Sequence, residues 1–142
     1  MRINQAGIDL IKSFEGVRLA AYRCPAGVLT IGVGHTGPDV HLKLVITLQE
    51  AEALLRGDLD HFEAAVAKAA PSATPNQAAA MISLAFNIGI GAFLKSSVLR
   101  HHNAGNPGAA ANAFLLWVKG GGRKLPGLVR RRAAERKLYL TP

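Results

Sequence analysis

Residues 13–36 concentrate four groups that can do chemistry: the carboxyl group of Glu15, the thiol of Cys24, the hydroxyl of Thr30 and the imidazole of His35. A carboxylic acid can protonate a leaving oxygen, and a thiolate or a hydroxyl group can hold or activate a water molecule. A thiolate can also attack a substrate directly. These residue types, this close together in the chain, form a candidate catalytic site.

A helix is expected to carry Glu15 at its C-terminal end. Asn4 is suited to the N-cap, and Gly16 is suited to the left-handed residue that ends a helix. Apolar or small residues recur in this segment at helical spacing, at Ile3, Gly7, Leu10, Ile11 and Phe14. The negative end of the helix dipole then lies beside the carboxyl group of Glu15 and favours its protonated form, which a general acid requires.

Two extended runs, residues 18–24 and 28–33, surround a Pro-Ala-Gly sequence. Proline suits the first central position of a type I turn and glycine suits the left-handed position, so we predict a hairpin with a three-residue loop and a bulge. In that register Cys24, Tyr22 and Thr30 project from the same face, because side chains alternate along a strand. A two-residue loop would place Thr30 on the other face.

The residues themselves leave the role of Cys24 open. A single cysteine is most often a small buried apolar side chain, and a thiol is mostly protonated at neutral pH unless its surroundings lower its pKa. Arg18 falls on the strand face of Cys24 by alternation, whereas Arg23 falls on the opposite face. We therefore keep two hypotheses, in which Cys24 acts as a thiolate or as an anchor for water.

This pattern resembles the active site of the phage-type lysozymes, the group of T4 lysozyme and the endolysins. In that family a glutamate is followed by an aspartate or, in one branch, a cysteine, and then by a threonine that opens a T-I-G-x-G-H-T run. Glu15, Cys24 and residues 30–36 match its spacings and the run. Trp117 and the sequences SLAFNIGIGAF and GLVRRRAAERKLYL are similar to the family's helical lobe. Cys24 replaces the commoner aspartate, and Val33 replaces an aromatic residue of many members.

The resemblance implies an α+β, lysozyme-like fold that is mainly helical. A small β-hairpin lobe, about residues 13–60, would be joined by a long helix to a larger helical lobe, about residues 61–142 plus the N-terminal helix, within one domain of residues 1–142. The implied activity is that of an endolysin or muramidase. It would hydrolyse the β-1,4 bond between N-acetylmuramic acid and N-acetylglucosamine in bacterial peptidoglycan and so lyse the host cell.

The resemblance also assigns roles to side chains. Glu15 would be the general acid, Cys24 would activate water or attack the sugar, and Thr30 would hold the water. Four residues match positions that line the saccharide cleft of the family: Thr36, Phe86, Ser96 and Asn112. Core packing would explain Phe86, and helix capping would explain Ser96, equally well.

His35 is expected to be structural rather than catalytic. The resemblance pairs it with an acid on the long helix, and Asp58 is the nearest match. No second ligand stands at a metal-binding spacing from His35. Neither a metal nor another cofactor is therefore predicted.

The segment after His35 predicts a loop and then a long helix. Residues 36–46 open with turn formers and alternate weakly, which suggests a loop and a short third strand. Thr47 and Glu50 form a capping box before apolar residues at helical spacing. This helix should run to about Ala70, with Gly57 as its weak point.

The remaining chain predicts further helices. Thr74 before Pro75 is a strong helix start, and residues 75–88 are apolar nearly all round, which indicates a buried helix. Other helices are expected from Ser96 or Ser97 to about Asn103, from Pro107 through Trp117, and from Pro126 to about Tyr139, with a glycine loop at residues 120–122.

Basic residues dominate the charge of the chain. The formal net charge is +8 and the isoelectric point is about 10.3. The C-terminal segment that we predict to be helical carries Arg123, Lys124, Arg130, Arg131, Arg132, Arg136 and Lys137. Such a run is usually a solvated face with internal salt bridges, for instance from Arg132 to Glu135, but it could also dock on anionic peptidoglycan, lipopolysaccharide or phospholipid. No binding motif supports nucleic acid, and we expect a monomer.

No targeting segment is expected. Charged residues interrupt the first fifteen positions, and no stretch approaches the roughly 20 apolar residues of a membrane span. A phage product of this kind would be made in the host cytoplasm and act on peptidoglycan of the periplasm or cell wall. The partner that the resemblance implies for that passage is a holin.

Two other functions stay open. A lytic transglycosylase also cleaves the glycan with one acid, but it leaves a 1,6-anhydro end instead of adding water. A basic module that binds cell wall or membrane would permeabilise the envelope without any catalysis.

Overall fold

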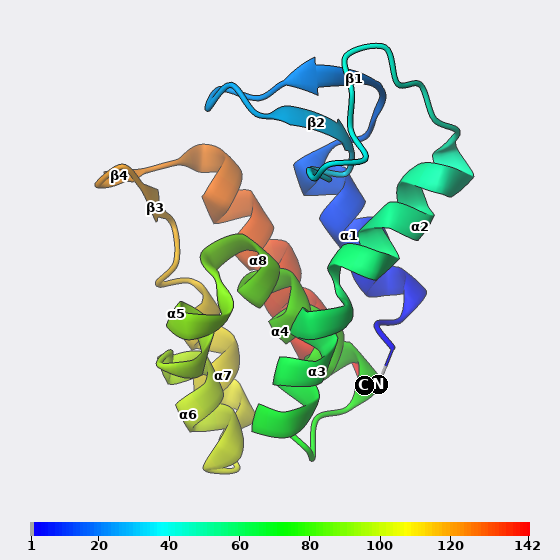
Figure 1. Cartoon of the computed structure of the whole chain (residues 1–142). Coiled ribbons are helices and arrows are strands. Elements are labelled where there is room, and N and C mark those ends of the chain that lie inside the picture. The colour runs from blue at the N-terminus through cyan, green and yellow to red at the C-terminus, as the bar shows by residue number, and fades with distance from the viewer. Residues whose placement is uncertain (1) are drawn as a thin grey trace. The chain divides into compact units, whose positions relative to one another are not determined.

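The computed structural model describes residues 2–142 and divides them into two compact units (Figure 1). The hairpin unit comprises residues Ile11–Asp60. The helical unit comprises the described residues up to Leu10 together with His61–Pro142. Helices dominate and the sheets are small and antiparallel, which confirms the predicted α+β class.

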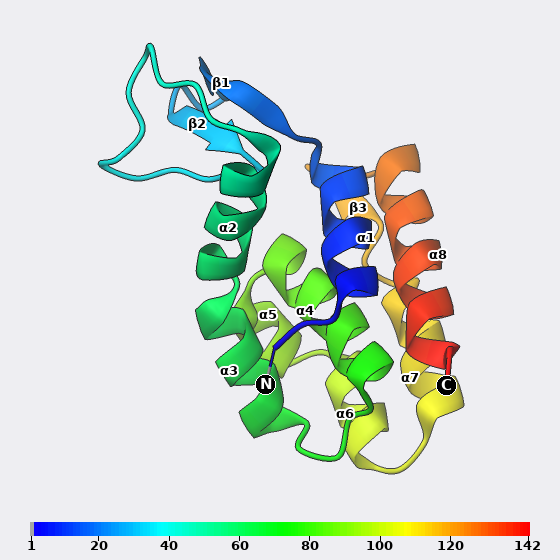
Figure 2. The same ribbon diagram turned by 90° about the vertical axis from the view of Figure 1, so that its right-hand side faces the viewer.

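The hairpin unit is built around two strands and one helix (Figure 2). Its elements are the second half of α1 (Gln5–Glu15), β1 (Arg18–Arg23), β2 (Leu29–Gly32) and α2 (Leu48–Asp58). The strands pair antiparallel, and their register shifts between Arg18 and Tyr22. The predicted capping box starts α2, because Thr47 Oγ1 accepts from the N–H of Glu50 while the Glu50 carboxylate accepts from the N–H of Thr47.

A small apolar core holds this unit together. The buried residues Ile31, Val40, Ile46 and Ala51 pack together, and partly buried apolar side chains of β1, β2 and α2 cover them. The predicted third strand is reduced to a single bridge between Ala20 and Val45. Ladder bonds at Ala21 and Ile46 flank this bridge, but the loop then turns into α2 before a strand can form.

The helical unit contains most of the helices (Figure 1). They are α3 (Asp60–Ala69), α4 (Pro75–Ile88), α5 (Ile90–Leu94), α6 (Ser97–Asn103), α7 (Pro107–Phe114) and α8 (Pro126–Leu140). Its strands are β3 (Lys119–Gly120) and β4 (Arg123–Lys124), which form a short hairpin before α8.

Helix α4 lies at the centre of the helical unit, as its sequence predicts. Every residue from Ala78 to Ala85 is buried, and α8 packs along it. The helix starts with a second capping box, in which Thr74 Oγ1 accepts from the N–H of Gln77 and the Gln77 side chain accepts from the N–H of Thr74. Gly89 ends it.

The predicted long helix over residues 48–70 is wrong, because two helices, α2 and α3, occupy this segment. The break falls at Leu59, whose N–H bonds to the carbonyl groups of both Gly57 and Leu55. Glycine has a low helix propensity, so Gly57 weakens the last turn of α2 before the break. Leu59 itself is fully buried.

Three predictions for the C-terminal segment are also corrected. Helix α7 ends at Phe114, not at Trp117, because the N–H groups of residues 115–117 bond to carbonyl groups three positions back instead of four. Gly120 lies on β3, so the predicted glycine loop is shortened to the turn residues Gly121 and Gly122. Arg123 and Lys124 accordingly lie on β4 and not on the last helix.

Candidate functional site

Glu15 is the last residue of α1, where the sequence predicts it. Gly16 follows with a φ of 77°, and its N–H bonds to the carbonyl group of Lys12 at 2.9 Å. A left-handed residue of this kind ends a helix, and glycine adopts it without a Cβ clash. The side chain of Glu15 is exposed, so its carboxyl group is accessible to a ligand.

The β1–β2 hairpin has the predicted three-residue loop. The N–H of Cys24 bonds to the carbonyl group of Val28 at 3.0 Å, and the N–H of Gly27 bonds back to the carbonyl group of Cys24 at 2.7 Å. Gly27 takes the left-handed position with a φ of 81°. Tyr22 lies opposite Thr30 in this register, so Cys24 and Thr30 share one face of the hairpin.

Backbone groups of the loop surround the sulfur of Cys24. The pKa of the half-buried thiol lies below its usual value, first because of a hydrogen bond from the backbone of Val28 and then because of one from Ala26. Partial burial opposes this shift, and a hydrogen bond with the side chain of Thr30 adds to it. Hydrogen bonds to the charged form favour the thiolate. Backbone hydrogen bonds of the hairpin therefore stabilise the thiolate of Cys24.

The two arginines of β1 point to other partners. The guanidinium carbon of Arg18 lies 4.3 Å from the ring centroid of Tyr22, and Arg23 Nη1 donates to the carbonyl group of Gly27 at 3.0 Å. Neither arginine contributes to the lowered pKa of Cys24. Sequence alternation could find the face of Arg18, but it could not show that loop amides stabilise the thiolate.

Thr30 is buried, with 3% of its surface exposed, and its hydroxyl group donates to the carbonyl group of Val28 at 2.9 Å. A hydroxyl group has one hydrogen and two lone pairs. That hydrogen goes to Val28 or, when Cys24 is ionised, to its thiolate, and the lone pairs of Thr30 can accept from a water molecule. The position of the hydroxyl is therefore fixed by the backbone of the same hairpin.

His35 binds the predicted partner and one more. Its Nδ1 lies 2.8 Å from Oδ2 of Asp58, and its Nε2 lies 3.0 Å from Oδ2 of Asp39. Burial opposes a charge on the ring, but the hydrogen bonds and charges of Asp58 and Asp39 outweigh this and raise the pKa of His35. The ring links the loop before α2 to the last residue of α2.

Asp39 is a residue that sequence reasoning missed. It lies four positions after His35 in a loop, where no helical or strand period predicts which side chains meet. The hydrogen bond from His35 lowers the pKa of Asp39. A histidine followed in a turn by an aspartate was the available signal, but it carries little information by itself.

The four predicted substrate contacts have different surroundings. Thr36 is exposed in the hairpin unit, whereas the other three belong to the helical unit. Phe86 packs edge-to-face on Phe62 with ring centroids 5.3 Å apart. Asn112 is exposed, and its Oδ1 accepts from Arg136 Nε at 3.1 Å.

Ser96 is used inside the protein. Its hydroxyl group is buried, donates to the carbonyl group of Phe93 at 2.7 Å and accepts from the N–H of Leu99 at 3.3 Å. These bonds make it the N-cap of α6, which supports the capping alternative. A substrate contact by Ser96 stays a prediction.

Two arginines of α8 are buried rather than solvated. Arg131 Nε lies 3.2 Å from Oε2 of Glu135, Arg132 pairs with the other carboxylate oxygen, and Ser83 donates to Glu135 at 2.5 Å. The predicted pair of Arg132 and Glu135 is thus present, but it lies in the core. Burial raises the pKa of Glu135, while Arg132, Ser83 and Arg131 oppose that shift.

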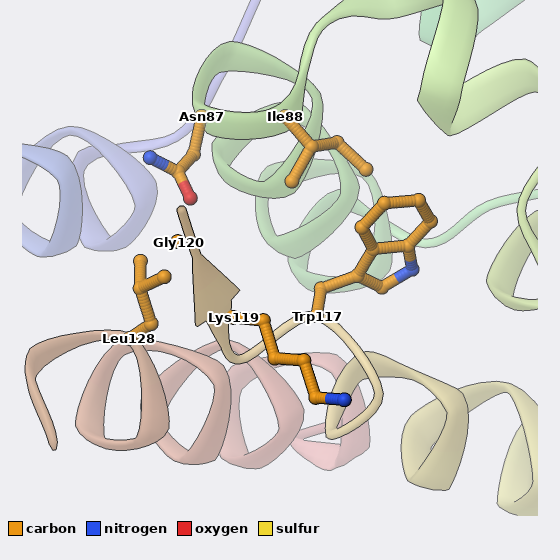
Figure 3. A pocket seen from close by; sticks show the side chains of 6 residues that line it. All are labelled: Asn87, Ile88, Trp117, Lys119, Gly120 and Leu128. Carbon is orange, nitrogen blue, oxygen red and sulfur yellow. The ribbon is translucent and has the colours of Figure 1, made fainter. Parts of the chain in front are cut away.

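A pocket of about 340 Å³ lies in the helical unit (Figure 3). Two of its lining residues accept hydrogen bonds from Arg132, Asn87 through Oδ1 and Trp117 through its carbonyl oxygen. The other lining residues are Ile88, Lys119, Gly120 and Leu128. Trp117 is half-buried at the side of this pocket and is not the core residue of a helix.

Residues 2–142 show neither a metal-binding cluster nor a membrane-spanning helix. No group of three or more histidine, cysteine, aspartate or glutamate side chains is placed to hold a metal ion there. Within the same residues, no helix has the length and apolar character that a membrane crossing requires.

The known proteins that are similar to this chain include endolysins, a muramidase domain and a lysozyme. Over 144 residues it is 49% identical to an endolysin of Bacillus phage B103, a match that covers 99% of this chain and 55% of that protein. The chain therefore spans about half the length of that relative. Among solved structures, the muramidase domain of SpmX from Asticaccaulis excentricus is 43% identical with a TM-score of 0.90, and the match covers 99% of both chains.

A second solved structure, a variant of the lysozyme of phage P22, is 42% identical with a TM-score of 0.91, again over 99% of both chains. The predicted lysozyme-like fold is thereby confirmed. A sequence model of the family described as phage lysozyme matches residues 12–135, which include the whole β1–β2 hairpin and most of α8. The chain belongs to the phage lysozyme family.

Proposed function

We propose that this chain is a muramidase that hydrolyses the β-1,4 bond between N-acetylmuramic acid and N-acetylglucosamine in bacterial peptidoglycan. Family membership supports cell-wall lysis in general. The observation that carries the specific proposal is the hairpin itself. It begins three residues after Glu15 and holds a thiol of lowered pKa next to a fixed hydroxyl group.

In the proposed reaction Glu15 donates its proton to the oxygen that leaves when the glycosidic bond breaks. The sugar then carries positive charge at its anomeric carbon. A water molecule held by Thr30 attacks that carbon and passes a proton to the thiolate of Cys24. The products are two shorter glycans, a neutral thiol and the Glu15 carboxylate, and proton exchange with solvent restores the starting state.

Covalent attack by Cys24 on the anomeric carbon is the other route that its chemistry allows. It would form a thioglycoside that water then hydrolyses. Mass spectrometry of the protein during turnover distinguishes the routes, because only the covalent route adds the mass of a glycan to the peptide that contains Cys24.

Thr36, Phe86, Ser96 and Asn112 remain the proposed saccharide contacts, and His35 with Asp58 remains a proposed structural pair. The structure gives different support to each contact. The exposed side chains of Thr36 and Asn112 are accessible to a sugar, Phe86 is half-buried, and the hydroxyl group of Ser96 is occupied by its capping bonds.

The proposed setting is the bacterial envelope. Peptidoglycan is the substrate, and passage of the chain from the host cytoplasm to the wall would use a holin. An anionic outer-membrane or phospholipid surface is a further proposed partner, and the proposed solution state is a monomer. The net charge of +8 supports contact with anionic envelope polymers.

The test measures reducing ends and product masses after digestion of purified peptidoglycan. Glu15→Gln should lower the rate by about 10²–10⁴, the range of a general acid. Glu52→Gln is the matched control, because Glu52 is a carboxylate of the same unit that pairs with Lys12 at 3.4 Å. Full activity of Glu15→Gln would refute the proposal, and lysis without new reducing ends would favour a non-enzymatic module. A 1,6-anhydro product would identify a lytic transglycosylase.

A further inference from the structure

The β3–β4 hairpin and the first turns of α8 gather positive charge without compensation. No acidic residue occurs between Glu63 and Glu135. We call this region the hairpin surface, and its exposed cations are Lys119, Arg123, Lys124 and Arg130. It belongs to the helical unit and not to the hairpin unit. None of these four side chains forms an ion pair with any part of the chain that the structure describes.

The strand register adds a direct conflict between like charges. Lys119 lies opposite Lys124 in the antiparallel pair, and Arg123 lies opposite Gly120. Like charges directly opposite each other destabilise a strand pair, and a hairpin of two residues per strand has few ladder bonds to offset this. An anion between the two lysines would remove the repulsion. The register is therefore a reason to expect an anionic ligand.

Apolar side chains lie on the same segment. Leu116 is 71% exposed, and Leu115 and Leu125 are 43% and 41% exposed. Leu125 follows β4 directly and lies close to Gly120 of β3, so it belongs to the hairpin surface. A soluble polyanion would leave these exposed leucines in water. A lipid bilayer would bury them in its apolar interior, which is favourable.

A pocket of about 400 Å³ completes the surface. Its lining residues are Lys124, Pro126, Val129 and Arg130. Two cations and two apolar residues in one pocket suit a ligand with a phosphate group attached to an apolar body. The other arginines of α8 have partners of their own: Arg131 and Arg132 are buried around Glu135, and Arg136 donates to Asn112.

We propose that the hairpin surface docks on anionic phospholipid, with lipid phosphates between Lys119 and Lys124 and in the pocket of Arg130, and with Leu116 inserted among the acyl chains. The inference rests on the proposed envelope setting, but it does not depend on catalysis. It also places the expected membrane contact on the β3–β4 hairpin and the first turns of α8, rather than along the whole face of the last helix (Figure 1).

The test is co-sedimentation with vesicles of phosphatidylcholine alone or mixed with phosphatidylglycerol. Each cation near an anionic surface contributes about fivefold in affinity, so Lys119→Gln with Lys124→Gln should weaken binding to the mixed vesicles about 25-fold. The matched control is Lys68→Gln with Lys95→Gln, which removes the same charge from exposed positions of the helical unit. The control should lose much less.

A second pair of variants tests the apolar part. Leu116→Ser should weaken vesicle binding at least fivefold, whereas Leu94→Ser, at a residue 48% exposed in α5, should leave it unchanged. Equal losses in the two lysine pairs would overturn the docking surface and leave only net charge. Loss in the lysine pair with full binding by Leu116→Ser, or equal competition by inorganic phosphate, would overturn the lipid assignment.

The same variants separate this inference from the proposed function. Glu15→Gln should bind vesicles like the unaltered chain, and the lysine and leucine variants should release reducing ends from soluble peptidoglycan fragments at the normal rate. An inactive but vesicle-binding chain would refute the muramidase proposal alone. An active chain that does not bind vesicles would refute the docking proposal alone.

Discussion

The two units of this protein use charge in opposite ways. The hairpin unit has five lysines and arginines and six aspartates and glutamates, a formal charge of −1. The rest of the chain has twelve and three, which gives +9 and accounts for the net charge of +8. The proposed catalytic groups thus lie in a nearly balanced unit, while the unit of the buried arginine cluster carries the excess of positive charge.

Equivalent residue types also behave differently in the two units. Glu15 is exposed at a helix end, whereas Glu135 is fully buried between two arginines. His35 lies between two carboxylates that raise its pKa, whereas burial lowers the pKa of His102. His102 Nδ1 lies 2.6 Å from the hydroxyl group of Tyr139. The comparison shows that surroundings, and not residue type, decide whether a charged group is available for chemistry.

The largest effect is expected from the same substitution made in each unit. Glu135→Gln leaves two buried arginines without their carboxylate and should lower the free energy of unfolding by about 3–5 kcal/mol. Glu15→Gln should change it by less than about 0.5 kcal/mol, because the residue is exposed. Denaturant unfolding measures both values. Similar losses of stability in the two variants would remove the distinction between the units.

Next in size is the effect of the thiol in the hairpin unit. Cys24→Ser should lower the rate of peptidoglycan hydrolysis by about 10² or more, because a hydroxyl group does not ionise at neutral pH. Activity should rise with pH through the lowered pKa of Cys24, and this limb should vanish in Cys24→Ser. Cys24→Asp, with the family's commoner residue, should restore activity at lower pH. An unchanged pH profile in Cys24→Ser would exclude a thiolate role.

The two histidines should give opposite pH trends in stability. The raised pKa of His35 means that its stabilisation is complete below the unfolded-state pKa of about 6.5 and is lost as the pH rises through the native value. A hydrogen bond to a charged group contributes about 1.5–3 kcal/mol, so His35→Asn should cost about 1.5 kcal/mol near pH 5.5 and less at pH 8. Asp39 must stay ionised, which sets the lower limit of this range near pH 4.

His102 provides the matched control for this trend. Its lowered pKa makes its contribution complete above about pH 6.5, and the contribution declines as the pH falls towards the native value. His102→Asn should therefore cost more at pH 8 than at pH 5.5. Melting temperatures of both variants across this range measure the trends. Parallel slopes in the two variants would contradict the assigned environments.

The smallest effects should be equal in the two units. Thr47→Ala and Thr74→Ala each remove a capping box, and each should lower the free energy of unfolding by about 1 kcal/mol. Such caps depend on local hydrogen bonds, which are alike in both places. A loss confined to one variant would show that one of the units unfolds separately from the other.

Much of the hairpin unit was predictable because its key features are local. Gly16 ends α1 after Glu15, and the loop closed by Gly27 sets the register of Cys24 and Thr30. Both depend on backbone conformations that few residues adopt, so the sequence reveals them. The break at Leu59 was less predictable, because the burial of a leucine depends on what packs around it.

The sequence alone determined the caps, the helix that ends at Glu15 and the three-residue hairpin, since each follows from contacts between residues a few positions apart. Tertiary structure alone decided that Arg131 and Arg132 are buried, that Asp39 completes the contacts of His35 and that loop amides lower the pKa of Cys24. The physical reason is that burial and charge environment are properties of the packed chain, and groups distant in sequence or placed by loops contribute to them.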